Sequence, residues 1–443
     1  MAVSFIASCF HVLTVIFQIF FLRYTTIMNL SDCFLPGEVL LPQVKDLEKW
    51  SVIACDQFTA DPAYWERVSA YVGQEPSTLR LMLPEAWLAR PDRSRLEAAI
   101  IENMERYLDR GLFRALPDSF IYLERTLSGG GLRRGILGLL DLEYYDYRED
   151  SCSPIHATEG LVMDRLPPRL RLRQQAALEL PHLVVFCDDP AMTVMTSAKE
   201  AAGPLLYDTP LMEGGGRVKG WRITGSGIGK VRAALEALGD EDYLRARYGE
   251  TGSPVLYAVG DGNHSLATAK RVWEELRDTL TPEERQTHPA RFALAELVDL
   301  HEKAIEFEPI HRVLFATDPA SFLAEAEAAF APWQGRGRSL RCLTSRGEVT
   351  LHVEGTIGEC IGFCESFMEA YRARHGGSID YIHGEAEAAA LCREADRAGL
   401  LMPEMDKSDL FPSIIRSGPL PKKSFSIGPA RDKRYYLECR RIK

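Results

Sequence analysis

The stretch Val255–Lys270, with the sequence VLYAVGDGNHSLATAK, constrains the fold of this chain more than any other. Its apolar first residues, Val255–Val259, are typical of a buried strand. The sequence GDGN follows at 260–263, and glycine permits the backbone angles of a tight turn. A helix is predicted next, because apolar residues recur at steps of three and four: Leu266, Ala269, Trp273, Leu276 and Leu280. The stretch therefore predicts a buried strand that leads through a turn into an amphipathic helix.

Polar residues gather at this turn, which makes it the first candidate site. Asp261 and His264 are candidates for a general base or a metal ligand, and Gly262, Asn263 and Ser265 would offer backbone N–H groups. Unpaired N–H groups and the positive end of the helix dipole attract anions at a helix N-terminus. The alternative is structural, with Asn263 capping the helix and Asp261 shaping the turn.

The composition is that of an ordinary globular protein. The chain has 443 residues, of which 46% are hydrophobic, and a net charge of -11. Such a charge argues against a nucleic-acid partner, since nucleic-acid-binding proteins gather Lys and Arg. The ten cysteines form no C-x-x-C pair, so we expect reduced thiols and a cytoplasmic protein. Alternating strand and helix signals predict a mixed α/β fold, with one large elaborated domain around a central mixed sheet.

The first 27 residues differ from the rest of the chain. Residues 5–22 are mostly apolar and resemble a signal peptide or a short membrane anchor. However, no positive charge precedes them, and Met28 opens a more polar stretch, so we favour a start at Met28 and a leader outside the mature fold. We expect a main α/β domain over residues 28–315, with no membrane association. A C-terminal α/β portion over residues 316–443 is expected to complete the same site.

Three further stretches carry candidate binding residues: His156, Glu159, Asp164 and Arg165; His311 and Arg312; and Lys422, Lys423 and Ser424. The first follows a predicted strand, and a solvated loop is the alternative for it. The second could reach an anionic group. The lysines stand in a loop that starts with proline, where they could hold phosphate or carboxylate, although surface lysines are usually only solvated. Other strands are predicted at 78–84, 120–126, 132–142, 183–186, 293–298 and 435–439.

Six motifs in one order resemble the domain-of-unknown-function 1015 family, over about residues 34–442. The family's P-Y-D-V corresponds to Cys55–Gln57, its N-x-x-R-L-x-L-P to Ser77–Pro84, and its P-H-E-x-T with D-R-L to Ile155–Glu159 with Asp164–Leu166. Its A-D-G-H-H-R-Y-E-T-A corresponds to Gly260–Ala269, its P-T-H-R to Pro309–Arg312, and its M-P-x-K-S-T-x-F to Leu420–Phe425. The D-G-H-H-R turn is similar to one that handles nucleotide phosphates in free-serine kinases with a ParB/sulfiredoxin-like fold. In this chain Asn263 and Ser265 replace its first His and its Arg.

The leading hypothesis is therefore a phosphotransferase that uses ATP and Mg²⁺ and acts on a small anionic metabolite. Asp261 or His264 would act as the base or a metal ligand, and the amides of residues 263–265 would hold phosphate. Three cationic side chains would neutralise charge, because phosphoryl transfer needs mainly positioning and electrostatics: Arg165, Arg312 and Lys423. Carboxylates would bind Mg²⁺, such as those of Asp261, Asp164 or Glu159.

Two other hypotheses fit the same residues. A metal-dependent hydrolase would bring His156, Asp261, His264 and His311 to one metal ion. A non-catalytic regulator would bind a nucleotide or metabolite without turnover. In each case residues from distant parts of the sequence should line one cleft, and we expect Asp164 or Arg165 to share it with His264 and His311.

Overall fold

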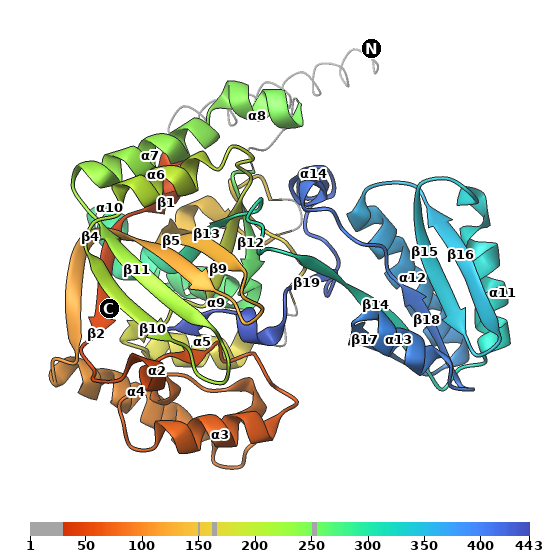
Figure 1. Ribbon diagram of the computed structural model, residues 1–443, viewed down its shortest axis with the longest axis horizontal. Helices are drawn as coiled ribbons and strands as arrows, with labels where there is room; N and C mark the ends of the chain where they lie inside the picture. Colours follow the sequence, from red (N-terminus) through yellow and green to blue (C-terminus); the bar gives the residue numbers. More distant parts are fainter. Residues whose placement is uncertain (1–29, 149–150, 162–165, 250–254) are drawn as a thin grey trace, which may run out of the picture.

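The computed structural model describes residues 30–148, 151–161, 166–249 and 255–443, and it confirms a mixed α/β fold. The predicted leader and the candidate residues Asp164 and Arg165 lie outside the described residues. The chain forms a larger lobe around an 11-stranded sheet and a smaller lobe around a six-stranded sheet (Figure 1). Within the described ranges, no helix combines the length and apolar composition needed to cross a bilayer.

The large sheet mixes parallel and antiparallel strands. Its strand order is β10-β11-β4-β5-β13-β9-β12-β7-β6, while β1 pairs with β5 and β2 with β4. Its strands are β1 (Phe34–Leu35), β2 (Gly37–Pro42), β4 (Phe113–Thr126), β5 (Leu132–Asp141), β6 (Tyr145–Asp146), β7 (Ile155–Ala157), β9 (Leu183–Cys187), β10 (Leu205–Pro210), β11 (Arg217–Ile223), β12 (Tyr257–Asp261) and β13 (Phe292–Asp299). β9 runs parallel to β13 but antiparallel to β12, and this change of direction positions the candidate site.

Helices cover one face of this sheet, and two separate clusters of side chains cover the other, one with helices from the first part of the chain and one with the smaller lobe. Successive residues of a strand point to opposite faces, so Val185 packs with α6 (Thr193–Ala201), α7 (Ser226–Leu238) and α9 (Asn263–Arg277), whereas Val184 packs with the smaller lobe. The remaining helices of the larger lobe are α2 (Leu47–Trp50), α3 (Pro62–Val72), α4 (Arg93–Asp109), α5 (Leu166–Gln175), α8 (Glu241–Tyr248) and α10 (Pro282–Thr287).

The smaller lobe is an antiparallel sheet with helices on both faces. Its strand order is β16-β15-β18-β14-β17, and β19 pairs with the beginning of β14, which runs from one lobe into the other (Figure 1). Its elements are β14 (Phe307–Phe315), α11 (Pro319–Phe330), β15 (Arg338–Thr344), β16 (Gly347–Val353), α12 (Ile357–His375), β17 (Ser378–His383), α13 (Glu385–Cys392), β18 (Arg397–Leu401), α14 (Leu410–Ser417) and β19 (Phe425–Ile427).

After β19 the chain returns to the larger lobe, where its C-terminus lies (Figure 1). There β20 (Tyr435–Tyr436) pairs with β3 (Val52–Ile53), and β21 (Arg440–Arg441) pairs with β8 (Leu178–Glu179). This return brings residues from the end of the chain to the beginning of the sheet.

Most of the predicted elements are confirmed, with shifted boundaries. The strand-turn-helix unit appears as β12 and α9, and Leu266, Ala269 and Trp273 are buried as expected. The strand predicted at 78–84 is wrong, because Thr78–Arg80 forms a 3-10 helix. The side chain of Ser77 accepts a hydrogen bond from the N–H of Leu79 at 3.3 Å. Such local bonds from serine compete with the hydrogen bonds of a strand.

Candidate functional site

Asp56, His182 and Asp261 form a compact group at one edge of the large sheet. Each offers one ligand atom, and these atoms all lie within 4.8 Å of one another. Because β12 and β9 are antiparallel, Asp261 at the end of β12 lies beside His182, which directly precedes β9. Asp56 follows β3, which is held in place by β20. The group therefore depends on pairings between distant parts of the sequence.

Hydrogen bonds and ion pairs surround this group. His182 contacts Tyr436 through Nδ1, which lies 2.7 Å from the Tyr436 hydroxyl oxygen, and contacts Asp56 through Nε2, which lies 3.3 Å from Oδ2. Gln57 donates a hydrogen bond to the other oxygen of Asp56 at 2.9 Å. The Nζ atom of Lys433 lies 3.6 Å from Oδ2 of Asp261. Two carboxylates thus face two cationic groups.

These contacts favour the charged forms of Asp56 and His182. Burial alone would raise the pKa of Asp56, but the charge and hydrogen bond of His182, a hydrogen bond from Gln57 and the charge of Lys433 hold it well below its ordinary value. Burial alone would lower the pKa of His182, but Tyr436 and the Asp56 carboxylate raise it well above its ordinary value. The contacts therefore favour a carboxylate beside an imidazolium.

Two carboxylates and one imidazole are also a donor set for a divalent cation. Carboxylate oxygens suit Mg²⁺ and Mn²⁺, and a neutral imidazole suits Mn²⁺ and other transition metals. A cation at this position would have to displace the proton of His182, because a histidine ligand must be neutral. The site can therefore hold either a proton or a metal ion on His182.

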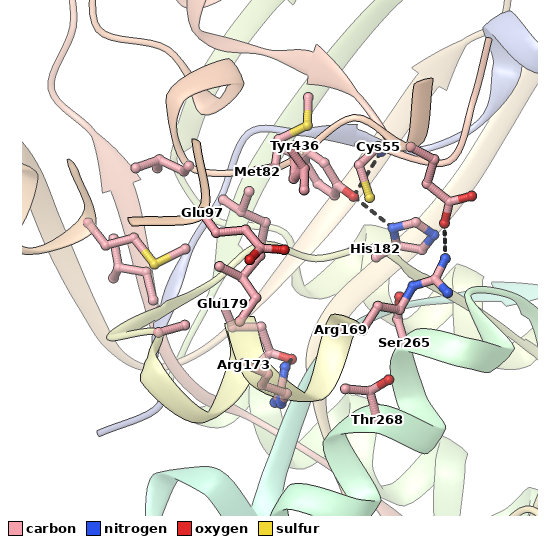
Figure 2. A pocket seen from close by; sticks show the side chains of 18 of the residues that line it. Cys55, Met82, Glu97, Arg169, Arg173, Glu179, His182, Ser265, Thr268 and Tyr436 are labelled. Atoms are coloured by element: carbon pink, nitrogen blue, oxygen red, sulfur yellow. Dashed lines mark hydrogen bonds and ion pairs between the residues drawn. The ribbon is translucent and has the colours of Figure 1, made fainter. Parts of the chain in front are cut away.

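A cavity of about 490 Å³ adjoins the group, and His182 forms part of its wall. Ser265 and Thr268, from the first turns of α9, also line it. Figure 2 shows His182 near Arg169 and Ser265, with Cys55 and Tyr436 beside them. Arg169 forms an ion pair with Glu85. A molecule bound in the cavity could thus contact both His182 and the N-terminus of α9.

The turn at residues 260–263 differs from the prediction in which Asn263 caps the helix. Gly262, not Asn263, is the N-cap of α9, and its φ of 86° lies in the left-handed region that favours glycine. A Cβ atom at Gly262 would lie 2.9 Å from the ring of His182 and 2.8 Å from Leu183. Glycine therefore lets the turn approach His182, and the N–H of Gly262 donates to Asp261 at 3.0 Å.

The side chain of Asn263 connects β12 to Thr158, which directly follows β7, and does not cap the helix. Its Oδ1 accepts a hydrogen bond from the N–H of Thr158 at 3.3 Å, and its Nδ2 donates to the carbonyl of Val259 at 3.3 Å. The capping role predicted for Asn263 is therefore wrong. His264 is half-buried, and its carbonyl accepts a hydrogen bond from Thr268 at 2.7 Å.

Two other predicted stretches meet beside this turn. Glu159 accepts hydrogen bonds from the backbone N–H groups of Lys423 at 3.2 Å and Ser424 at 3.0 Å, so it holds the loop that carries both lysines. Through Asn263 and Thr158 this loop is tied to the end of β12. His156, by contrast, is buried within β7, and burial lowers its pKa.

His311 and Arg312 point to opposite faces of β14, as neighbours in a strand do. His311 accepts a hydrogen bond from the N–H of Met402 at 3.0 Å through Nδ1, and burial lowers its pKa. Arg312 donates to Glu365 at 3.2 Å, and its guanidinium lies 5.3 Å from the ring centre of Tyr381. Lys422 and Lys423 also lie over that ring, at 5.9 Å and 5.8 Å.

The metal-binding set suggested by the sequence is not found among the described residues. The group close enough to share one ion there contains Asp261 but none of His156, His264 and His311. The sequence did not indicate a site role for His182, Lys433 or Tyr436, and it indicated Asp56 only through the family motif. Their positions at strand ends could have indicated two of these residues, since Asp56 follows an apolar strand and His182 precedes one.

The fold and site together define a mixed α/β protein with a candidate metal centre beside a cavity. The chain belongs to the family described as "Protein of unknown function (DUF1015)", whose model matches residues 36–408. This match confirms the family resemblance that the six motifs indicated. No curated protein matches the sequence.

Several solved structures are similar to the chain at low identity. C-terminally truncated SbnI from Staphylococcus aureus has a TM-score of 0.35 at 9% identity, over 66% of this chain and 82% of that chain. A mutant free serine kinase in complex with AMP has a TM-score of 0.37 at 8% identity, over 69% and 91%. A conserved hypothetical protein from Pyrococcus furiosus has a TM-score of 0.32 at 10% identity, over 68% and 90%. These TM-scores are too low to define corresponding positions.

Proposed function

We propose that the protein binds a divalent cation at Asp56, His182 and Asp261 and uses it to position a nucleotide phosphate for transfer to a small metabolite. The observation that carries this proposal is the convergence of three ligand atoms within 4.8 Å of one another, one of them on His182, which lines a cavity of about 490 Å³. Phosphoryl transfer requires mainly positioning and charge neutralisation, and the cation, Lys433 and the N-terminus of α9 supply these.

In the proposed reaction, a hydroxyl oxygen of the metabolite attacks the terminal phosphorus of ATP. The bond between that phosphorus and the bridging oxygen breaks, ADP leaves with the electron pair, and the hydroxyl proton passes to a base. His264, on the first turn of α9, is the proposed base. Lys423, on the loop held by Glu159, would offset the charge of an anionic substrate group.

The test measures Mn²⁺ binding by the electron paramagnetic resonance signal of free Mn²⁺. Asp56→Asn and Asp261→Asn should each weaken binding at least about tenfold, because each removes a charged ligand. Asp92→Asn, at an aspartate distant in sequence and paired with Arg90, serves as the control. Transfer of the terminal phosphate of ATP to a pool of metabolites would then be followed by phosphorus NMR. Mn²⁺ binding that is unaffected in Asp56→Asn and Asp261→Asn would overturn the proposed site.

The same donor set favours one other function, a metal-dependent hydrolase. A cation held by Asp56, His182 and Asp261 could lower the pKa of a bound water and supply the nucleophile. A hydrolase would release phosphate or carboxylate from an ester without ATP, whereas the phosphotransferase requires ATP and an acceptor. Binding of ATP and Mn²⁺ without any turnover would instead indicate a regulator.

A further inference from the structure

We infer that the cavity beside Asp56, His182 and Asp261 accepts the uncharged, mainly aliphatic body of the substrate, with the reacting polar end at His182. The position of the reacting end rests on the proposed function. The aliphatic character of the body rests on the cavity walls alone. The substrate would be a small molecule with a polar head and a body of several carbons.

The walls of the cavity are largely apolar. Eleven of the 22 residues that line it are Leu, Met, Ile or Ala. Leu81, Met82, Met104 and Leu178 are all buried, so their side chains are fixed by packing around the cavity. Met side chains also adapt to irregular aliphatic shapes. Such walls gain free energy by covering methylene groups.

The carboxylates that line the cavity already have basic partners. These ion pairs are Glu85 with Arg169, Glu97 with Arg93 at 2.8 Å, and Glu179 with Arg173 at 3.2 Å. Glu179 is paired a second time, with Arg440 at 2.8 Å. A charged body would have to break one of these pairs or remain without a partner in a partly apolar space, which is costly. The walls therefore select a body without charge.

Aromatic side chains are scarce in these walls. Of the described residues that line the cavity, only His182 and Tyr436 carry rings, and the two are hydrogen-bonded to each other. Proteins that bind nucleobases commonly stack them on aromatic side chains, and these walls offer no pair of rings between which a base could lie. We therefore assign the cavity to an aliphatic body and place the nucleotide base elsewhere.

The polar lining residues that are not carboxylates or their partners lie near His182, whereas ion-paired residues also line other parts of the wall. Figure 2 shows Cys55, Tyr436, Arg169 and Ser265 around His182, and Glu97, Glu179 and Arg173 in another part of the wall. A polar head would therefore turn toward His182, because the carboxylates in the other part of the wall are already ion-paired. About 490 Å³ is within the range of small-molecule sites.

The experiment titrates the protein with straight-chain primary alcohols, from propanol to octanol, by isothermal calorimetry without metal or nucleotide. The Kd should fall about fourfold for each added methylene, which corresponds to ~0.8 kcal/mol per buried CH₂. The fall should stop at the chain length that fills the cavity. A Kd that does not change with chain length would overturn the inference.

A matched pair of variants locates the binding. Leu172→Trp places a bulky side chain in the cavity from α5 and should abolish the dependence on chain length. Leu170→Trp is the control, because Leu170 lies on the same helix but does not line the cavity. Equal chain-length dependence in both variants would overturn the location. If Leu172→Trp does not fold, the alcohol series on the unmodified protein still decides the inference.

The result is separable from the proposed function. A flat alcohol series together with normal Mn²⁺ binding would overturn the aliphatic body and leave the metal site standing. A steep series without Mn²⁺ binding would support the aliphatic cavity and overturn the metal-dependent chemistry.

Discussion

His182 is the residue on which the chemistry of the candidate site depends. Its Nδ1 lies 2.7 Å from the hydroxyl of Tyr436, and its Nε2 lies 3.3 Å from Asp56. With both nitrogens engaged and its pKa raised, the imidazole favours its protonated form. The proposed cation competes with that proton for the ring, so metal binding and protonation are linked.

The first prediction follows from this competition. Mn²⁺ affinity should increase as the pH rises toward the raised pKa of His182, by up to about tenfold per pH unit, because one proton leaves for each ion bound. Calorimetry in buffers of different ionisation enthalpy would measure the released proton. In His182→Gln the affinity should be lower and its dependence on pH should largely disappear. A dependence that is as steep in His182→Gln would assign the proton to another group.

The second prediction concerns stability without metal. The folded-state pKa of His182 is above its unfolded value of about 6.5, so its contribution is complete below that pH and is lost as the pH rises through the folded-state pKa. The folded-state pKa of Asp56 is below its unfolded value of about 3.9, so its contribution is complete above that pH and is lost as the pH falls. Urea unfolding across this range should show the loss at high pH in the natural protein but not in His182→Gln.

At the scale of elements, the loop at 420–424 depends on Glu159. Both oxygens of this carboxylate accept backbone N–H groups, from Lys423 and Ser424, and Lys423 has a φ of 58°. A non-glycine residue rarely adopts such an angle without support from its surroundings. Glu159 thus connects the smaller lobe to the strand beside the candidate site.

The third prediction tests this connection. Glu159→Gln keeps the size of the side chain but turns one acceptor into a donor, which leaves an N–H group of the loop unpaired. The free energy of unfolding should fall by about 1–3 kcal/mol, and amide exchange should increase at 420–424. Glu283→Gln, at an exposed position of α10, is the control and should change neither quantity. Unchanged exchange at the loop in Glu159→Gln would contradict this role.

The local sequence was sufficient for most of the elements but not for the site. Hydrophobic periodicity located β12, α9 and the β4–β5 hairpin, because each depends on residues close together in sequence. The proximity of Asp56, His182 and Asp261 arises from the pairing of β9 with β12 and of β3 with β20. No local pattern encodes those pairings, so the turn was found as a candidate and His182 was not.

At the scale of the whole molecule, the C-terminal segment at residues 433–438 connects the candidate site to the large sheet. Arg434 is buried, and its guanidinium lies 2.7 Å from Glu296 of β13 and also contacts Glu438. It stands between Lys433, which contacts Asp261, and β20, which contains Tyr436. The ion pair therefore positions two groups that contact the candidate metal ligands.

The last prediction separates this buried pair from a surface pair in the same segment. Arg434→Met should lower the free energy of unfolding by about 3–5 kcal/mol, because it removes the cationic partner of the buried Glu438 and leaves the buried Glu296 with Arg133 alone, at 3.3 Å. Arg441→Met removes the partner of Glu38, where both side chains are largely exposed, and should cost at most about 1 kcal/mol. Denaturant unfolding measures both values. Mn²⁺ affinity should also fall in Arg434→Met but not in Arg441→Met, because only the first displaces Lys433 and Tyr436. If the two variants are equally stable, the C-terminal segment is held by its strand pairing and apolar packing instead, and the buried ion pair does not position the site.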